Sequence, residues 1–144
     1  MNKKFLYIFG FFLLAGVFIE VMLAVKDARS GPRCQSHSCI GLDSRELRCD
    51  SKVETLTSKT TGGLTIELRY SPSCNASWAK SVVPVGSTLY VQDTKGQEFG
   101  HYIVPPDGIM TAHYGNMGGG KELRACARLP NTQDVCTVIP RSEK

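Results

Sequence analysis

Polar and apolar residues alternate most regularly between Leu64 and Tyr70, in the sequence LTIELRY. This period of two is typical of a β-strand with one buried and one solvated face. The apolar face consists of Leu64, Ile66, Leu68 and Tyr70. Pro72 cannot donate a hydrogen bond to a sheet ladder, so the strand is predicted to end in a corner at residues 71–73. A second extended run, carrying Cys74 and Trp78, is expected to follow.

Glycines and turn residues divide most of the remaining chain into short strands. Gly62 and Gly63 predict a tight reversal that joins a strand at 53–57 to the run from Leu64. A strand at 88–92 and a return at 97–104 flank the turn Asp93-Thr94-Lys95-Gly96. Simple alternation places Phe99, His101 and Ile103 on one face of that return.

The last third of the chain continues in the same way. Residues 109–114 predict a short strand, and the glycine-rich run 115–120 predicts an open loop. Residues 123–128 and 135–139 predict a closing hairpin. The pattern therefore indicates an all-β fold, a small disulfide-stapled sandwich or barrel of about six to eight short strands.

The first thirty residues follow a different pattern, that of an export segment. Lys3 and Lys4 precede an apolar run from Phe5 to Val25 that only Glu20 interrupts. A charged start followed by an apolar stretch is typical of a secretory signal. If this segment is not cleaved, residues 5–25 are long enough to span a bilayer. We expect residues 1–30 to be a signal peptide or signal anchor and residues 31–144 to form one extracellular domain, secreted or held at the outer face of the cytoplasmic membrane.

The charge of the predicted domain excludes one class of function. Beyond Ser30 the chain has thirteen Lys and Arg against eleven Asp and Glu, a net charge of +2. A nucleic-acid binder needs a basic face that neutralises phosphates, so nucleic acid is not an expected partner.

The cysteines indicate disulfides. All six lie beyond the apolar segment, in a compartment expected to be oxidising, and they are Cys34, Cys39, Cys49, Cys74, Cys126 and Cys136. There is no Cys-x-x-Cys, the usual motif of thiol oxidoreductases and many zinc sites, so neither a metal nor a cofactor is predicted. Cys126 and Cys136 are equidistant from Asn131, so a symmetric hairpin sets them directly opposite each other and predicts their pairing. The other four cysteines allow three pairings, and Cys74 meets the segment 34–49 in each.

Two motifs resemble a known family. The cysteines at 34, 39 and 49, with Gly41 and Asp43, are followed by the more specific run ELRYSP-x-C-x-A-x-WA, residues 67–79. Together they resemble the YjfA-like family of small exported bacterial proteins of unknown function. The resemblance covers most of the chain after Cys34. It implies an extracellular domain and no catalytic residue.

The residues themselves offer one catalytic alternative. His101 and His113, with Glu67 and Lys80 or Lys121, contain the groups that a small secreted nuclease-like hydrolase uses as acid, base and phosphate-binding cation. The pattern is unspecific, because a histidine that shares a strand face with Phe99 and Ile103 is the ordinary mark of a core residue.

A second set of side chains favours binding. These side chains combine an apolar body with a polar tip, as groups that bind sugars and peptides do, and they are Arg69, Tyr70, Trp78, Tyr102 and Tyr114. The main hypothesis is therefore a non-enzymatic extracellular module that binds a cell-envelope component, a peptide or a partner protein.

Overall fold

The computed structural model describes residues 31–106, 111–130 and 133–141. The chain divides into two units, Met1–Gly31 and Pro32–Lys144, and the second contains every described helix and strand. The predicted export segment, residues 1–30, lies outside the described residues. Among the described residues, no helix is both long enough and apolar enough to cross a membrane.

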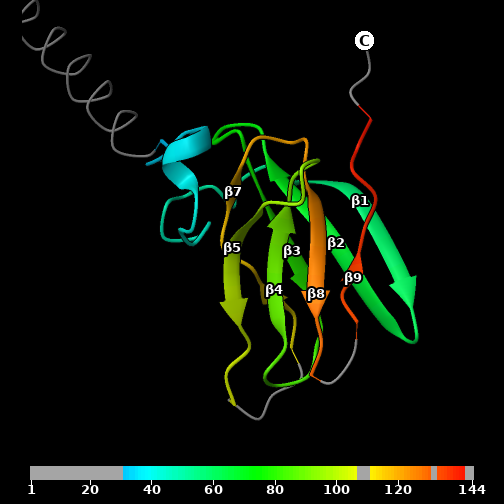
Figure 1. The fold of residues 1–144 in the computed structure, drawn as a ribbon. Coiled ribbons are helices and arrows are strands. Elements are labelled where there is room, and N and C mark those ends of the chain that lie inside the picture. Colours follow the sequence, from blue (N-terminus) through cyan, green and yellow to red (C-terminus); the bar gives the residue numbers. More distant parts are fainter. Residues whose placement is uncertain (1–30, 107–110, 131–132, 142–144) are drawn as a thin grey trace, which may run out of the picture. The chain divides into compact units, whose positions relative to one another are not determined.

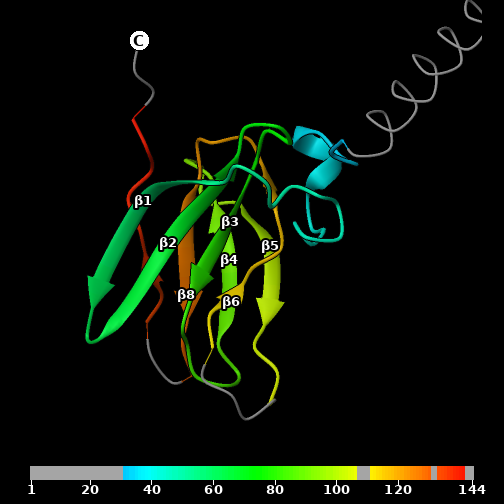
Figure 2. The same cartoon turned by 180° about the vertical axis from the view of Figure 1, so that it is seen from behind.

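Two antiparallel sheets pack face to face (Figure 1). Sheet A has the order β1 (Glu54–Thr61), β2 (Leu64–Ser71), β3 (Ala76–Ser81) and β6 (His113–Tyr114), and β7 (Gly118–Gly119) also pairs with β3. Sheet B has the order β5 (Glu98–Ile103), β4 (Thr88–Gln92), β8 (Arg124–Arg128) and β9 (Val135–Cys136). Sheet B lies in front in Figure 1 and sheet A in front in Figure 2. The all-β prediction is confirmed, and its sandwich form is the one found.

The core between the sheets comes from the alternating apolar positions. Ile66 and Leu68 of β2 and Ala79 of β3 meet Leu89 and Val91 of β4, all fully buried. Ala125 and Ala127 of β8 complete the facing layer. Burying a large aliphatic side chain contributes about 1.5–3 kcal/mol, so these positions fix which face of each strand points inward.

Residues at and beside the turns determine where the two hairpins form. Gly62 and Gly63 both have positive φ, 55° and 78°, and join β1 to β2 in the tight reversal that the sequence predicts. At the other end of the chain, β8 and β9 pair in the predicted register, with Cys126 opposite Cys136. These two cysteines form a disulfide with their Cα atoms 4.1 Å apart.

The prediction that Phe99, His101 and Ile103 share one face of this strand is wrong beyond Phe99, because β5 contains a bulge. Val91 of β4 pairs with Phe99, but Leu89 pairs with Tyr102, so two residues of β5 oppose one of β4. Gly100 adopts a φ of +64° at this point, as expected of glycine in a bulge. The extra residue reverses the alternation, so Tyr102 packs against the core and His101 is exposed.

The glycine-rich run 115–120 is not an open loop. Its Gly118–Gly119 pair forms β7 against Ala76 and Ser77 of β3. A Cβ atom at Gly118 would lie 2.6 Å from Val91 Cγ2, so only glycine fits there. The glycines of this run therefore allow close packing between β3 and the core.

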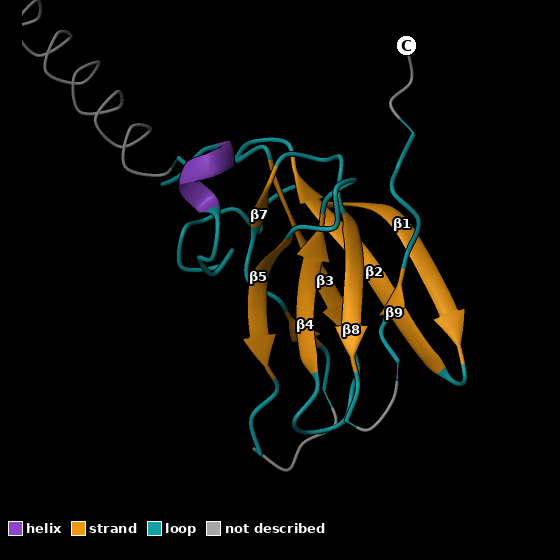
Figure 3. Cartoon of the chain, in the orientation of Figure 1, coloured by secondary structure: helices purple, strands orange, loops and turns teal. Residues whose placement is uncertain are grey.

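Residues 32–53 form the N-terminal lobe, which is almost entirely loop (Figure 3). Its one helix, η1 (Ser36–Cys39), is a single 3₁₀ turn. Backbone hydrogen bonds join the lobe to the sandwich, from Ser36 to Cys74 at 2.7 Å and between Gly41 and Met117 at 2.8 Å. The disulfides Cys34–Cys39 and Cys49–Cys74 complete its attachment. The lobe thus has a fixed position against the β2–β3 corner.

Candidate ligand-binding site

The outer face of sheet A, away from the sandwich core, places two predicted binding residues side by side. Arg69 of β2 and Trp78 of β3 are direct register partners. Tyr114 of β6 pairs with Lys80, two residues further along β3 from Trp78. Residues two apart on a strand share a face, so Arg69, Trp78 and Tyr114 lie on one surface.

The N-terminal lobe turns this surface into a pocket of about 200 Å³. Sheet A supplies Arg69, Trp78 and Tyr114 to its wall. The lobe supplies Ser44, Arg45, Asp50 and Val53. The disulfide Cys49–Cys74 joins these two walls, because Cys49 precedes Asp50 and Cys74 lies at the corner that leads into β3.

Trp78 has a buried hydrogen-bond donor, its indole Nε1–H. The residue is only 2% exposed and packs in one cluster with Met117 and the cysteines at 34, 39, 49 and 74. Its Nε1–H has no hydrogen-bond partner among the described residues. A buried donor without an acceptor costs about 1–3 kcal/mol, so such a group calls for an explanation.

The charged groups of the pocket differ in how they are held. Arg69 donates to Glu67 at 3.2 Å and also to Thr55, and Lys80 approaches the same Glu67 oxygen at 3.4 Å. This network fixes Arg69 in place on the sheet. The Arg45 guanidinium instead lies over the Tyr114 ring, 4.4 Å from its centroid, a cation–π contact that leaves its N–H groups available.

The other two predicted binding residues lie elsewhere. The Tyr70 hydroxyl donates to Asn75 Oδ1 at 3.1 Å, beside the β2–β3 corner. Tyr102 stacks on His113, with ring centroids 6.1 Å apart. Neither lines the pocket. The structure therefore brings together Arg69, Trp78 and Tyr114 and separates Tyr70 and Tyr102 from them.

The two histidines of the hydrolase alternative do not converge. His113 is buried against Tyr102, whereas His101, the neighbour of Tyr102 on β5, stacks on Tyr90 at 5.4 Å. Consecutive strand residues point to opposite faces, so the two imidazoles lie on different surfaces. Neither histidine lines the pocket beside Trp78.

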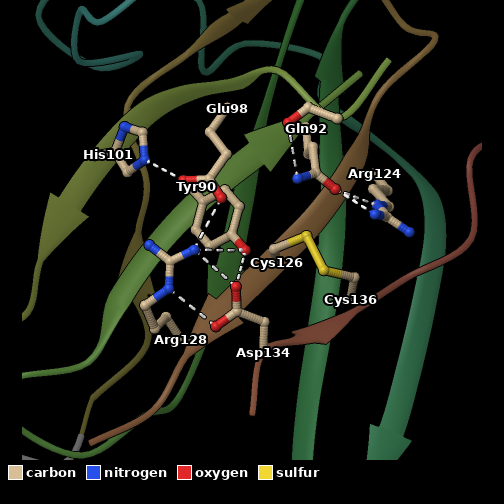
Figure 4. Close-up of polar contacts among 10 residues, drawn as sticks. Tyr90, Gln92, Glu98, His101, Arg124, Cys126, Arg128, Asp134 and Cys136 are labelled. Atoms are coloured by element: carbon tan, nitrogen blue, oxygen red, sulfur yellow. Dashed lines mark hydrogen bonds and ion pairs between the residues drawn. A yellow bond between two sulfur atoms is a disulfide. The ribbon is translucent and has the colours of Figure 1, made fainter. Parts of the chain in front are cut away.

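His101 belongs to a closed polar network on the outer face of sheet B (Figure 4). It contacts Glu98 at 2.8 Å, and Arg128 bridges Glu98 and Asp134, also at 2.8 Å to each. Tyr90 donates a short hydrogen bond to Asp134, and Arg128 lies over its ring. Each member therefore has its partner within the network.

Burial and the hydrogen bonds within the network shift the pKa values of three of its members. The His101 hydrogen bond, aided by Arg128, lowers the pKa of Glu98. The Arg128 hydrogen bond lowers the pKa of Asp134. Burial and the hydrogen bond to Asp134 raise the pKa of Tyr90 well above its usual range. These carboxylates are stabilised as anions, which suits a structural role better than that of a general acid.

Residues 37–127 match the family model described as "Protein of unknown function (DUF2690)". This match covers more than half of the 144 residues. The chain belongs to the DUF2690 family. No curated protein and no solved structure gave a match. The description establishes a domain of unknown function, and the YjfA-like assignment is a finer statement than it supports.

The DUF2690 match contains every residue of the pocket, including four that sequence reasoning did not select. Arg45 and Ser44 carry no periodic signal, and Asp50 reads as an ordinary surface acid. Their place beside Trp78 depends on the Cys49–Cys74 pairing, which the sequence leaves open among three. Only knowledge of that disulfide would have identified them.

A second, larger pocket of about 690 Å³ lies where η1, the β4–β5 turn and the loop after β7 meet. His37, Asp93 and Lys121 are among its lining residues. None of the five predicted binding residues lines it. Asp93 uses its carboxylate to accept from the backbone N–H groups of Lys95 and Gln97, so its role there is to shape the turn.

Four cysteines, three in the lobe and one at the β2–β3 corner, form the one group able to hold a metal among the described residues. The Sγ atoms of Cys34, Cys39, Cys49 and Cys74 all lie within 4.8 Å of one another. Zinc binds thiolates, whereas these sulfur atoms are joined as two disulfides. In this DUF2690 domain the cluster therefore acts as a covalent staple, and metal binding would require its reduction.

Proposed function

We propose that this protein is an exported, non-enzymatic binding module whose ligand is a cell-envelope component or a peptide. The pocket beside Arg69 and Trp78 carries this proposal, because it is lined by two arginines and by Trp78, whose buried Nε1–H has no partner among the described residues. Such an arrangement is suited to recognition, because polar side chains line the pocket beside two aromatic residues.

Three features support the export component of the proposal. All six cysteines are disulfide-bonded, which is compatible with an oxidising compartment. The basic and apolar pattern of residues 1–30 is that of a secretory signal or anchor. The resemblance to the YjfA-like family of exported proteins points to the same location. The hydrolase alternative has no comparable support, because its two histidines lie on different surfaces.

Export is tested by accessibility. Intact cells that produce the chain with a C-terminal epitope tag are treated with a protease that does not enter them. We expect the tag to be lost from the cells or found in the medium, and mass spectrometry of the protein then separates a cleaved signal from an uncleaved anchor. A tag that remains protected in intact cells and is digested only after lysis would contradict export.

Binding is tested by co-sedimentation with purified envelope fragments. We expect the wild-type chain to pellet with the fragments and Arg69→Ala to remain largely in the supernatant. Arg124→Ala is the matched control, because Arg124 lies on sheet B and donates to Gln92 at 2.8 Å, away from the pocket. If the wild-type chain does not pellet, or if Arg69→Ala pellets equally well, the pocket is not the binding site.

A further inference from the structure

We propose that the pocket recognises the carboxylate end of a peptide whose last residue has a small apolar side chain. This inference rests on the proposed binding function and specifies its ligand. It follows from the donors, the net charge and the size of the pocket.

Three of the side chains that line the pocket, Arg45, Arg69 and Trp78, carry N–H donors and no acceptor. The Trp78 Nε1–H is buried and has no acceptor among the described residues. An ionised carboxylate is an acceptor only, so it complements this N–H as well as the guanidinium groups of Arg45 and Arg69. Guanidinium groups hold carboxylates in a planar, two-point contact. A ligand carboxylate that contacts the Trp78 Nε1–H would therefore satisfy a donor that has no partner among the described residues.

The net charge of the lining residues favours a ligand with one negative charge over a ligand with two. Arg45 and Arg69 contribute +2 and Asp50 contributes −1, so the lining residues carry a net charge of +1. Glu67 already neutralises part of Arg69 at 3.2 Å. The net charge of +1 would balance the single negative charge of a carboxylate, but only part of the charge of a dianionic phosphate. Asp50 has no charged partner among the described residues and repels any anion that enters.

The size of the pocket and the apolar part of its wall limit what can accompany the carboxylate. The pocket volume of about 200 Å³ is smaller than the roughly 300–1,000 Å³ of sites that enclose drug-sized ligands. Val53, Trp78 and Tyr114 provide apolar surface next to the donors. The space therefore suits one terminal residue with a small side chain, with the rest of the peptide outside.

Trp78 is the only tryptophan in the chain, so its fluorescence reports on this pocket alone. The full-length chain, kept in a mild detergent, is titrated with N-acetyl-alanyl-alanine, with the C-terminal amide of the same peptide and with inorganic phosphate. We expect saturable binding of the acid, and binding of the amide about 10-fold weaker or more, because a hydrogen bond to a charged group is worth about 1.5–3 kcal/mol. Amide or phosphate binding as tight as that of the acid would overturn the carboxylate assignment.

Three substitutions, measured by calorimetry, test the roles of the groups. Arg45→Gln, at an exposed position that does not threaten folding, is expected to weaken binding of the acid about 10-fold. Trp78→Phe keeps an aromatic ring but removes Nε1–H and is expected to weaken it by several-fold. Asp50→Asn removes the repulsion and is expected to strengthen binding of the acid while leaving the amide unchanged. Weaker binding of the acid by Asp50→Asn would overturn the inference.

The two proposals fail in distinguishable ways. Envelope fragments that bind the wild-type chain but not Arg69→Ala, combined with equal binding of acid and amide, would leave the binding function standing and remove the carboxylate. Arg124→Ala should match the wild-type chain in every titration, because its hydrogen bond to Gln92 lies on sheet B.

Discussion

The molecule has two buried clusters that are built on different principles. Between the sheets, the cluster is aliphatic, and strands β2, β3, β4 and β8 contribute to it through regular alternation. Between sheet A and the N-terminal lobe, the cluster consists of four cysteines, Ala76, Trp78 and Met117. The first is held by strand pairing and apolar burial, and the second by two disulfides around one large aromatic side chain.

This difference explains why the pocket lies at the lobe. A segment with one 3₁₀ turn and few apolar residues does not bury enough surface to offset the entropy of ordering its backbone. The disulfides supply the missing constraint. Because the lobe is held covalently, its loop side chains need not all pack, and Arg45 and Asp50 remain available at the edge of the cluster.

The strongest test of the comparison removes one disulfide from each region. Replacing Cys49 and Cys74 by Ser opens a link of 25 residues, and loop-closure entropy predicts a loss of about 3.5 kcal/mol in the free energy of unfolding. Replacing Cys126 and Cys136 opens a link of 10 residues, with a predicted loss of about 2.7 kcal/mol. Denaturant titration followed by circular dichroism measures both losses.

The same two variants differ in what happens at the pocket. Trp78 packs on the Cys49–Cys74 disulfide, so we expect its emission to shift to longer wavelength only when that disulfide is removed. The variant without Cys126 and Cys136 should retain the wild-type emission spectrum in its folded state. Equal shifts in both variants would show that the two clusters are not independent.

Signals confined to neighbouring residues made much of the fold predictable. The Gly62-Gly63 turn, the strand at 88–92 and the hairpin register around Cys126 all depend on a few residues close in sequence. The lobe depends on a disulfide between residues 25 apart, and no local pattern selects it. Arg69 and Trp78 were predicted as binding residues because each combines an apolar body with a polar tip, whereas Arg45 and Asp50 were missed because their position follows from that disulfide.

The wrong face of β5 has a different cause. Alternation assumes an unbroken strand, and the extra residue at Gly100 reverses it, which exposes His101 and Ile103. A glycine inside a strand pattern is a known signal for a bulge. Gly100 therefore indicated the bulge in the sequence, whereas a strict alternation of two faces does not allow for an extra residue.

Gly100→Ala tests how firmly the sandwich holds this bulge. A Cβ atom at Gly100 would lie 2.0 Å from the backbone oxygen of Asn116, and its φ is +64°. Overpacking and the left-handed backbone together predict a loss of about 3 kcal/mol in the free energy of unfolding. Gly96→Ala is the control, because Gly96 has a φ of +84° but no atom within 4 Å of the added Cβ. Its loss should be about 1 kcal/mol, and equal losses in thermal or denaturant melts would mean that the contact with Asn116 is not constraining.

The smallest expected effect concerns the polar network of sheet B, which contributes through charge and not through burial. Arg128→Ala removes the ion pairs to Glu98 and Asp134. The Arg128 side chain is 44% exposed. Solvent screening therefore limits the loss in the free energy of unfolding to about 1 kcal/mol at neutral pH. Arg124→Ala, on the same strand, removes hydrogen bonds to the neutral Gln92 and serves as the control (Figure 4).

The variants of these two arginines should differ in how their stability depends on pH. The pKa values of Glu98 and Asp134 are lowered in the folded state, by hydrogen bonds from His101 and Arg128 to Glu98 and from Arg128 to Asp134. A lowered pKa contributes stability above the unfolded value of about 4, and that contribution is lost as the pH falls through the folded value. The difference in melting temperature between the wild-type chain and Arg128→Ala should therefore be largest near pH 6–7 and shrink as both carboxylates are protonated, below about pH 4. The difference for Arg124→Ala should not change over this range, because its partner does not titrate. A pH-independent difference for Arg128→Ala would show that this side chain stabilises sheet B by packing over Tyr90, and not through its two ion pairs.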